Sequence, residues 1–262
     1  MTSRLLAALI ALALAATANA DVTIKATGTG QGLGMSGSTS STTYIKGRRM
    51  RVEGQTGKKS TTTIFDVENQ KMYVLDAKKK EAEAWDMAAL SQEVAKAVAV
   101  ESAKATMTPN GQTKVISGLN TEGYNMEIVV PATIGGEGGM AMTILLTGTT
   151  WVAKGAPGTA DYAAFYIGAA EKGWFFTDPR TAKGAPGQAR AMAQMYEEFA
   201  KLGGVPYESD MDIKIQGEGP MATLMAKMGG ISMNTTTDSV DTAALADDLF
   251  LPPADYTLKQ KE

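Results

Sequence analysis

Apolar and polar positions alternate most clearly between Thr61 and Asp86, in three short runs that two polar turns separate. The runs are Thr61–Val67, Met72–Leu75 and Glu81–Trp85, and the turns are Glu68–Lys71 and Asp76–Lys80. β-Branched and aromatic residues bounded by turn residues are typical of strands, so this segment predicts an antiparallel meander. Such a meander buries one face, and an apolar layer must pack against that face.

The same patterns predict further strands and a few helices along the chain. The strands are Asp21–Thr27, Tyr44–Glu53, Thr113–Leu119, Gly123–Val130, Met142–Val152, Ser209–Gln216 and Ile231–Val240. The helices are Met87–Met107 with Asp86 as N-cap, Ala160–Glu171 with Thr159 as N-cap, and Gln188–Leu202. Many strands with a few inserted helices indicate an α+β fold, mainly antiparallel, in a single domain.

Glycine, serine and threonine dominate the stretch Gly28–Thr43, and Gly32–Gly37 has the spacing G-x-G-x-x-G. A dinucleotide site with this spacing needs a helix directly afterwards, and strand-forming residues follow instead. We therefore interpret these glycines as a flexible turn. The pattern assigns no role to the glycine-rich loop Gly135–Gly139 or to the methionine-rich segment Pro220–Gly229.

The first twenty residues have the three parts of a secretory signal peptide. Arg4 supplies the positive charge, Leu5–Ala16 is apolar, and Ala18–Ala20 ends in the form A-x-A. The apolar run is shorter than the roughly 20 residues that a membrane span needs. Cleavage after Ala20 leaves a chain of 262 − 20 = 242 residues. We predict a periplasmic protein without a lipid anchor, because no cysteine follows the cleavage site.

The chain contains no His and no Cys. Zinc, copper, haem and Cys–His sites depend on these side chains, so the composition excludes such chemistry. Loss of Arg4 with the signal leaves 24 basic against 28 acidic residues, a net charge of −4. This mild acidity argues against a nucleic-acid-binding protein. We expect no cofactor, no metal and at most peripheral contact with a membrane.

Several segments resemble a bacterial envelope family of unknown function whose fold is similar to the lipoprotein-localisation factors LolA and LolB. They are Tyr44–Arg51, Ile64–Asp66, Lys71–Asp76, Lys78–Lys80 with Trp85, Gly118–Val130, Thr150–Val152, Gly203–Pro206 and Phe250–Tyr256. The resemblance covers most of the chain after residue 20. It implies an unclosed β-barrel or strongly curved sheet, wrapped around helices, with an apolar cavity. It supplies no catalytic or binding residue.

Methionine is the residue that favours a ligand cavity, since the chain has 16 Met against 6 Phe. Unbranched, polarizable methionine lines surfaces that accept varied apolar partners. Met126 lies near the middle of the chain, and Met142, Met211, Met221, Met225, Met228 and Met233 fall in its second half. Our candidate lining for a lipid or acyl chain is Phe65, Tyr73, Trp85, Met126, Met142, Trp151, Met221 and Met225. The alternative is that each of these residues simply fills an irregular core.

A second hypothesis is an interaction or sensor protein that docks a protein partner without carrying lipid. Its candidate docking surface consists of the basic residues Arg48, Arg49, Arg51, Lys78, Lys79 and Lys80. Charges on a solvated strand edge explain the arginines equally well, because they deter edge-to-edge aggregation.

Catalysis is a remote alternative. Without His, a nucleophilic serine would need Lys or a carboxylate as its base. Gly34–Ser38 resembles a nucleophile elbow but lacks the final glycine. A hydrolase that uses two carboxylates is conceivable, yet no spacing selects a pair. We therefore expect a protein without enzymatic activity.

Overall fold

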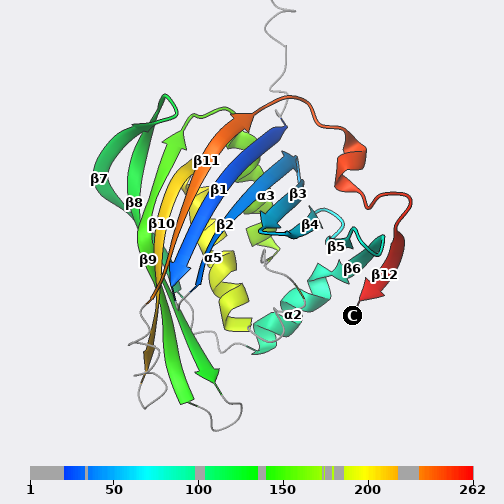
Figure 1. Ribbon diagram of the computed structural model, residues 1–262, viewed down its shortest axis with the longest axis horizontal. Helices are drawn as coiled ribbons and strands as arrows, with labels where there is room; N and C mark the ends of the chain where they lie inside the picture. Colours follow the sequence, from blue (N-terminus) through cyan, green and yellow to red (C-terminus); the bar gives the residue numbers. More distant parts are fainter. Residues whose placement is uncertain are drawn as a thin grey trace, which may run out of the picture.

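A single open sheet of twelve strands organises the chain (Figure 1). The structure is a computed structural model that describes residues 21–32, 35–97, 104–134, 140–172, 174, 179, 186–217 and 230–261. In space the strands follow the order β12-β6-β5-β4-β3-β2-β1-β11-β10-β9-β8-β7. Neighbouring strands are antiparallel except for β12, which pairs parallel to β6.

The strands have the following bounds: β1 Val22–Gly32, β2 Met35–Lys46, β3 Arg49–Thr56, β4 Lys59–Asp66, β5 Lys71–Asp76, β6 Glu81–Asp86, β7 Lys104–Ile116, β8 Leu119–Ile134, β9 Met140–Lys154, β10 Gly204–Gly217, β11 Ile231–Asp241 and β12 Thr257–Lys261. The helices are α2 Met87–Ala97, α3 Thr159–Glu171, α5 Pro186–Leu202 and the 3₁₀-helix η1 Asp247–Phe250.

The sheet curves around α3 and α5, so one face is covered by helices and the other is turned outward (Figure 1). We call these the inner and the outer face. Inward-facing residues such as Ile24, Ile45 and Phe65 pack with Phe165 of α3 in the main core. A smaller core joins Met126, Ile128 and Val130 of β8 to Met195 and Phe199 of α5. The predicted curved, unclosed, mainly antiparallel α+β sheet around a few helices is therefore confirmed.

The predicted meander is confirmed as β4, β5 and β6. The two turns place Gln70 and Lys80 at positive φ, 54° and 53°. The predicted N-cap of α2 is also present, because the Asp86 carboxylate accepts hydrogen bonds from the backbone N–H groups of Ala88 and Ala89.

The glycines interpreted as a turn, Gly32–Gly37, lie where the long hairpin β1–β2 reverses. Gly32 ends β1 and pairs with Met35, the first residue of β2. The glycine-rich strands extend further than predicted, since Gly28 pairs with Thr39 and Gly30 pairs with Gly37. The predicted strand Tyr44–Glu53 is wrong as a single strand, since Gly47 has φ 55° and turns the chain between β2 and β3.

Further boundaries differ from prediction. The structure describes α2 over Met87–Ala97, and Lys104–Met107, predicted as the end of this helix, belongs to β7 instead. The predicted strand Thr113–Leu119 starts within a longer strand, β7, whose pairing with β8 shifts between Pro109 and Thr113. The N-cap of α3 is Gly158, with φ 75°, and the Thr159 hydroxyl donates to the Ala156 carbonyl instead.

The C-terminal segment, from η1 to β12, crosses the outer face of the sheet over β3 and β4 and reaches the edge strand β6. There η1 packs on β3 and β4, and the fully buried Phe250 ring lies beneath the Arg49 guanidinium. β12 then covers the free edge of β6, where Lys259 pairs with Glu81 at 2.7 Å. Among the described residues, none of the helices has the length and apolar character of a membrane span.

Candidate functional site

Four methionines form one transverse row across the inner face of the sheet. The strand register places Met107 opposite Met126, Met126 opposite Gly148, Gly148 opposite Met211, and Met211 opposite Met233. The row continues through Gly30 of β1 to Gly37 of β2. We call these seven positions the methionine row. It spans seven strands from four separate parts of the chain, so only the sheet brings it together.

Side-chain alternation fixes the face on which this row lies. Met126 is 3% exposed in the small core beneath α5, and Met107 and Met211 pack against that core. Toward the other end of the row, Met233 is 43% exposed. The α5 helix therefore covers one end of the row and leaves the other accessible.

Glycines leave free space at the accessible end. A Cβ at Gly37 would meet no atom within 4 Å, and one at Gly30 would touch the Met233 side chain at an ordinary 3.8 Å. Gly148 is different, because a Cβ there would come within 1.9 Å of the Asp210 carbonyl oxygen. Gly148 thus permits close strand packing, whereas Gly30 and Gly37 make room on the inner face.

A pocket of about 160 Å³ adjoins the row, between the inner face and α3. Ser209 and Thr235, two residues along from Met211 and Met233, belong to its lining, together with Tyr162 and Tyr166. Burial raises the pKa of both tyrosines, so their hydroxyls stay protonated at physiological pH. The space therefore offers uncharged hydroxyl groups at one end and flexible apolar side chains at the other.

The residues predicted as cavity lining divide into three groups. Phe65 and Trp85 lie in the main core, and Met126 lies in the methionine row. Met142 is 5% exposed and faces inward, since it is six residues from Gly148 on the same strand.

Tyr73 and Trp151 face the outer side of the sheet. Tyr73 alternates with the core residues Met72 and Val74, and Trp151 is three residues from Gly148. The Lys114 ammonium lies 4.2 Å from the Trp151 ring. The structure does not bring these two aromatic residues to the methionine row. Met221 and Met225 lie outside the described residues, as do Pro220–Gly229 and Gly135–Gly139.

Sequence reasoning missed Met107, Gly30 and Gly37 as members of one site, and it did not select Met211 and Met233 from the other methionines. For Met211, the sequence did contain a signal of its face, because this residue alternates with Asp210 and Asp212 along the strand. The cross-strand register that joins the row is not visible in a single strand.

Three of the six basic residues of the predicted docking surface contact the C-terminal segment. Arg49 donates to the Asp247 carboxylate at 2.7 Å, and Arg51 donates to the Leu249 carbonyl at 3.1 Å. Lys80 pairs with Asp255 at 2.8 Å. Lys79 lies 3.7 Å from Asp76. Arg48 lies toward α3, where a Cβ at Gly168 would come within 3.6 Å of its side chain.

Ionisable groups do not converge at the methionine row. Among the residues that the structure describes, no group of three or more Asp or Glu side chains is arranged to hold a metal ion. The raised pKa of Tyr162 and Tyr166 leaves neither hydroxyl suited to act as a base. The chemistry of this site is therefore that of packing and uncharged hydrogen bonds.

No protein-family model and no curated protein matches the sequence. Among solved structures the chain is similar to PNGF-II, with 11% identity and a TM-score of 0.29 over 92% of this chain. That similarity spans 31% of the PNGF-II chain, about a third of its length.

The chain is also similar to a putative outer membrane lipoprotein-sorting protein domain from Vibrio parahaemolyticus. The identity is 5% and the TM-score 0.28, over 88% of this chain and 89% of that one. A LolA superfamily protein from Nitrosomonas europaea matches with 6% identity and a TM-score of 0.29, over 89% of this chain and 90% of the other. At such TM-scores the similarities establish no shared ligand or activity.

Proposed function

We propose that this protein is an exported, non-enzymatic binding protein that holds a lipid or another acyl-chain ligand against the inner face of its sheet. The observation that supports this function is the methionine row, which ends in free space beside Gly30 and Gly37. Methionine side chains adapt to apolar ligands of different shapes. Elongated apolar ligands suit a row that runs across many strands.

The polar end of the ligand has a place in the adjoining pocket. Ser209 and Thr235 lie two residues along their strands from Met211 and Met233. Tyr162 and Tyr166 line the same pocket, so all four residues bring uncharged hydroxyl groups to it. An amphiphile with its chain along the methionines and an uncharged polar group beside Tyr166 would satisfy both regions. On this proposal the chain starts at Asp21 after export and acts in the periplasm as one domain.

Two substitutions test the site, one by adding a charge to the methionine row and one by filling the free space at its accessible end. Met211→Asp places a carboxylate in the middle of the row, and Gly37→Leu fills space that a side chain can enter without a clash. We expect both to weaken the binding of a fluorescent apolar probe at least tenfold. Asp212→Asn changes the next residue on the opposite face and should leave probe binding unchanged.

Thermal unfolding of each variant separates lost binding from lost folding. Gly37→Leu should keep the wild-type Tm within a few degrees, because Gly37 lies at an exposed, unstrained position. Organic extraction of protein purified from the envelope, followed by mass spectrometry, should detect a lipid in near-stoichiometric amount. An empty protein that captures a specific envelope protein would support the docking hypothesis instead. Hydrolysis of any ester or glycoside in a substrate library would support the alternative hypothesis of a hydrolase.

A further inference from the structure

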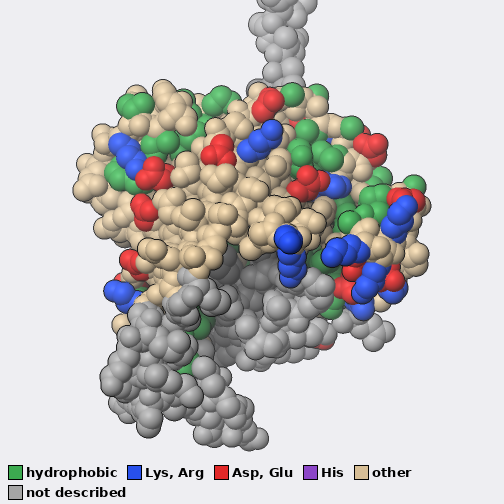
Figure 2. All heavy atoms as spheres, in the orientation of Figure 1, with side chains coloured by type: hydrophobic (Ala, Val, Ile, Leu, Met, Phe, Trp, Pro, Cys, Tyr) green, Lys and Arg blue, Asp and Glu red, His purple; other side chains and the backbone are tan. Residues whose placement is uncertain are grey.

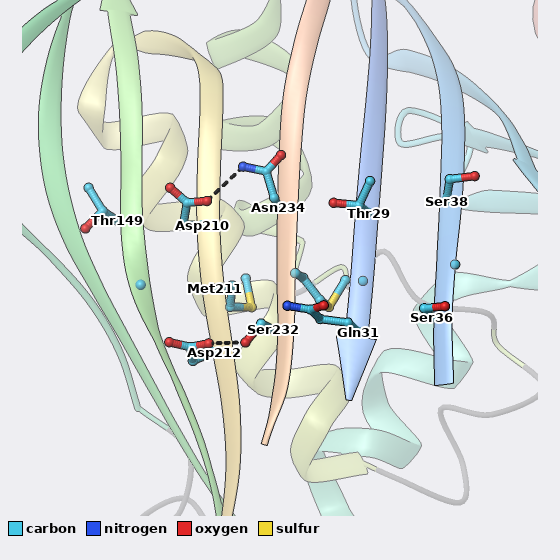
Figure 3. A pocket seen from close by; sticks show the side chains of 14 residues that line it. Thr29, Gln31, Ser36, Ser38, Thr149, Asp210, Met211, Asp212, Ser232 and Asn234 are labelled. Carbon is cyan, nitrogen blue, oxygen red and sulfur yellow. Dashed lines mark hydrogen bonds between the residues drawn. The ribbon is translucent and has the colours of Figure 1, made fainter. Parts of the chain in front are cut away.

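The outer face carries a polar trough directly behind the methionine row. Its cavity of about 820 Å³ lies over β2, β1, β11, β10 and β9 (Figure 3). Two transverse rows of side chains form its walls. The first consists of Ser38, Thr29, Asn234, Asp210 and Thr149, and the second of Ser36, Gln31, Ser232, Asp212 and Thr147.

The trough continues across the next two strands. A second cavity of about 430 Å³ is lined by Thr147, by Asn125 and Glu127 of β8, and by Thr106 and Thr108 of β7. The register assigns each of these residues to one of the same two rows. We call the two adjoining cavities together the polar trough. At a spacing of about 4.8 Å between strands, seven strands give it a length of about 29 Å.

The side chains of the two rows are of one chemical kind. All carry hydroxyl, amide or carboxylate groups, and none is basic, aliphatic or aromatic. The positions between the rows belong to the methionine row. Met126, Met211 and Met233 also line the cavities, although strand alternation turns their side chains inward, and Gly30, Gly37 and Gly148 have no side chain. The floor is therefore open backbone with polar groups on both sides.

Charge restricts what can lie in the trough. Asp210, Asp212 and Glu127 are its ionisable groups, and two of them are already hydrogen-bonded within it. The Asn234 amide donates to Asp210 at 2.8 Å, and the Ser232 hydroxyl donates to Asp212 at 2.6 Å (Figure 3). Without a cation in either row, an anionic polymer would meet only repulsion.

The surrounding surface agrees with this restriction. Figure 2 shows that the outer face over β1, β2 and β11 has few charged side chains, whereas Lys and Arg gather near β6 and β12. A ligand of the trough must therefore be recognised by uncharged hydrogen bonds. It must also be long and thin, since the cavity crosses seven strands.

We propose that the polar trough binds a linear, uncharged glycan that lies across the strands. Sugar hydroxyl and acetamido groups both donate and accept hydrogen bonds, as do the Ser, Thr, Asn and Gln side chains of the two rows. The carboxylates of Asp210 and Asp212 accept from sugar hydroxyls in stronger, charge-assisted bonds. The trough is independent of the apolar site, because its walls face the opposite side of the sheet.

The experiment titrates the full-length exported protein with oligosaccharides that differ in charge and length, using calorimetry or NMR. We expect saturable binding of cello- or chito-oligosaccharides, stronger for longer chains until the trough is filled. Oligogalacturonate, which is anionic, should not bind. Asp212→Ala and Asn234→Ala should each weaken glycan binding about tenfold, with unchanged Tm.

Two control variants make the result specific. Thr42→Ala removes a hydroxyl from the outer face of β2 beyond the trough, and it should bind glycan like the wild type. Met211→Asp should lose the apolar probe and keep the glycan, so failure of one proposal is distinguishable from failure of the other. Absence of binding to every uncharged oligosaccharide at millimolar concentration would overturn the proposal. Binding of chitosan oligomers alone would also overturn it, since it would identify a surface for polycations.

Discussion

Asp86 shows how much one side chain contributes at a junction between a strand and a helix. Its Oδ1 accepts the N–H groups of Ala88 and Ala89 at the start of α2, and its Oδ2 accepts from Lys71 at 3.0 Å. Asp86→Ala should lower the free energy of unfolding by about 1 kcal/mol, the usual cost of a lost N-cap. Asp86→Asn is the matched control, because asparagine caps equally well and loses only the exposed ion pair. Denaturant unfolding measures both, and equal losses would contradict the capping role.

The same carboxylate gives a pH prediction. The backbone N–H of Ala89, and then the Lys71 ammonium, lower the pKa of Asp86 below its ordinary value of 3.8. A carboxylate with a lowered folded-state pKa stabilises the protein fully above its unfolded pKa, and this contribution is lost as pH falls through the folded pKa. The stability difference between wild type and Asp86→Ala should therefore be constant near neutral pH and shrink below about pH 4. A difference that grows on acidification would contradict it.

Individual side chains of the candidate site were predictable only in part. Met126 faces inward in β8, where apolar and polar residues alternate regularly, but it was selected for its residue type and not from this alternation. Tyr73 and Trp151 are aromatic residues in strands too, yet they face outward, where aromatic rings tolerate a half-buried position. Residue type alone does not report the face. The face follows from counting along the strand from a residue of known burial.

At the scale of elements, Phe250 supplies the buried apolar contact of the C-terminal segment. Phe250 of η1 is fully buried against the outer face, whereas the next residue, Leu251, is 53% exposed. Phe250→Ala should lower the free energy of unfolding by about 3–5 kcal/mol, the usual cost of deleting a buried aromatic ring. Leu251→Ala, the neighbouring control, should change it by less than about 0.5 kcal/mol. Hydrogen exchange should show faster exchange of η1 in the first variant alone, and similar effects of both would contradict the anchor.

Elements with a clear apolar period were predicted well, and elements without one were not. β10 reads directly from the alternation of Met211, Ile213 and Ile215 with charged residues. The glycine-rich parts of β1 and β2 lack this signal, because Gly28, Gly30 and Gly37 stand at inward positions. Alanine-rich sequence beyond Ala97 also continued the helical pattern, although β7 begins at Lys104. In these places the neighbouring strands determine the structure more than local propensity does.

At the scale of the whole molecule, one set of strands serves two faces of opposite chemistry. Neighbours in sequence, such as Met211 and Asp212, belong to the methionine row and the polar trough respectively. The two-residue period of a strand makes this possible, because a change at one position leaves the other face intact. The Gly/Ser/Thr composition gives the glycine-rich parts of β1 and β2 no apolar period, and it is also what both proposed sites require. Glycine leaves space on the inner face, and hydroxyl groups supply hydrogen bonds on the outer face.

This arrangement predicts how the two ligands act together on stability. A ligand that binds only the folded protein, present at a hundredfold excess over its Kd, adds about 2.7 kcal/mol. Because the polar side chains of the trough and the methionine side chains point to opposite faces of the shared strands, the effects of an acyl-chain ligand and an oligosaccharide should add, to about 5.4 kcal/mol. Denaturant unfolding with each ligand alone and with both together measures the sum. A combined effect no larger than that of one ligand would mean that both compete for one face, and the division of the sheet into two binding surfaces would then be wrong.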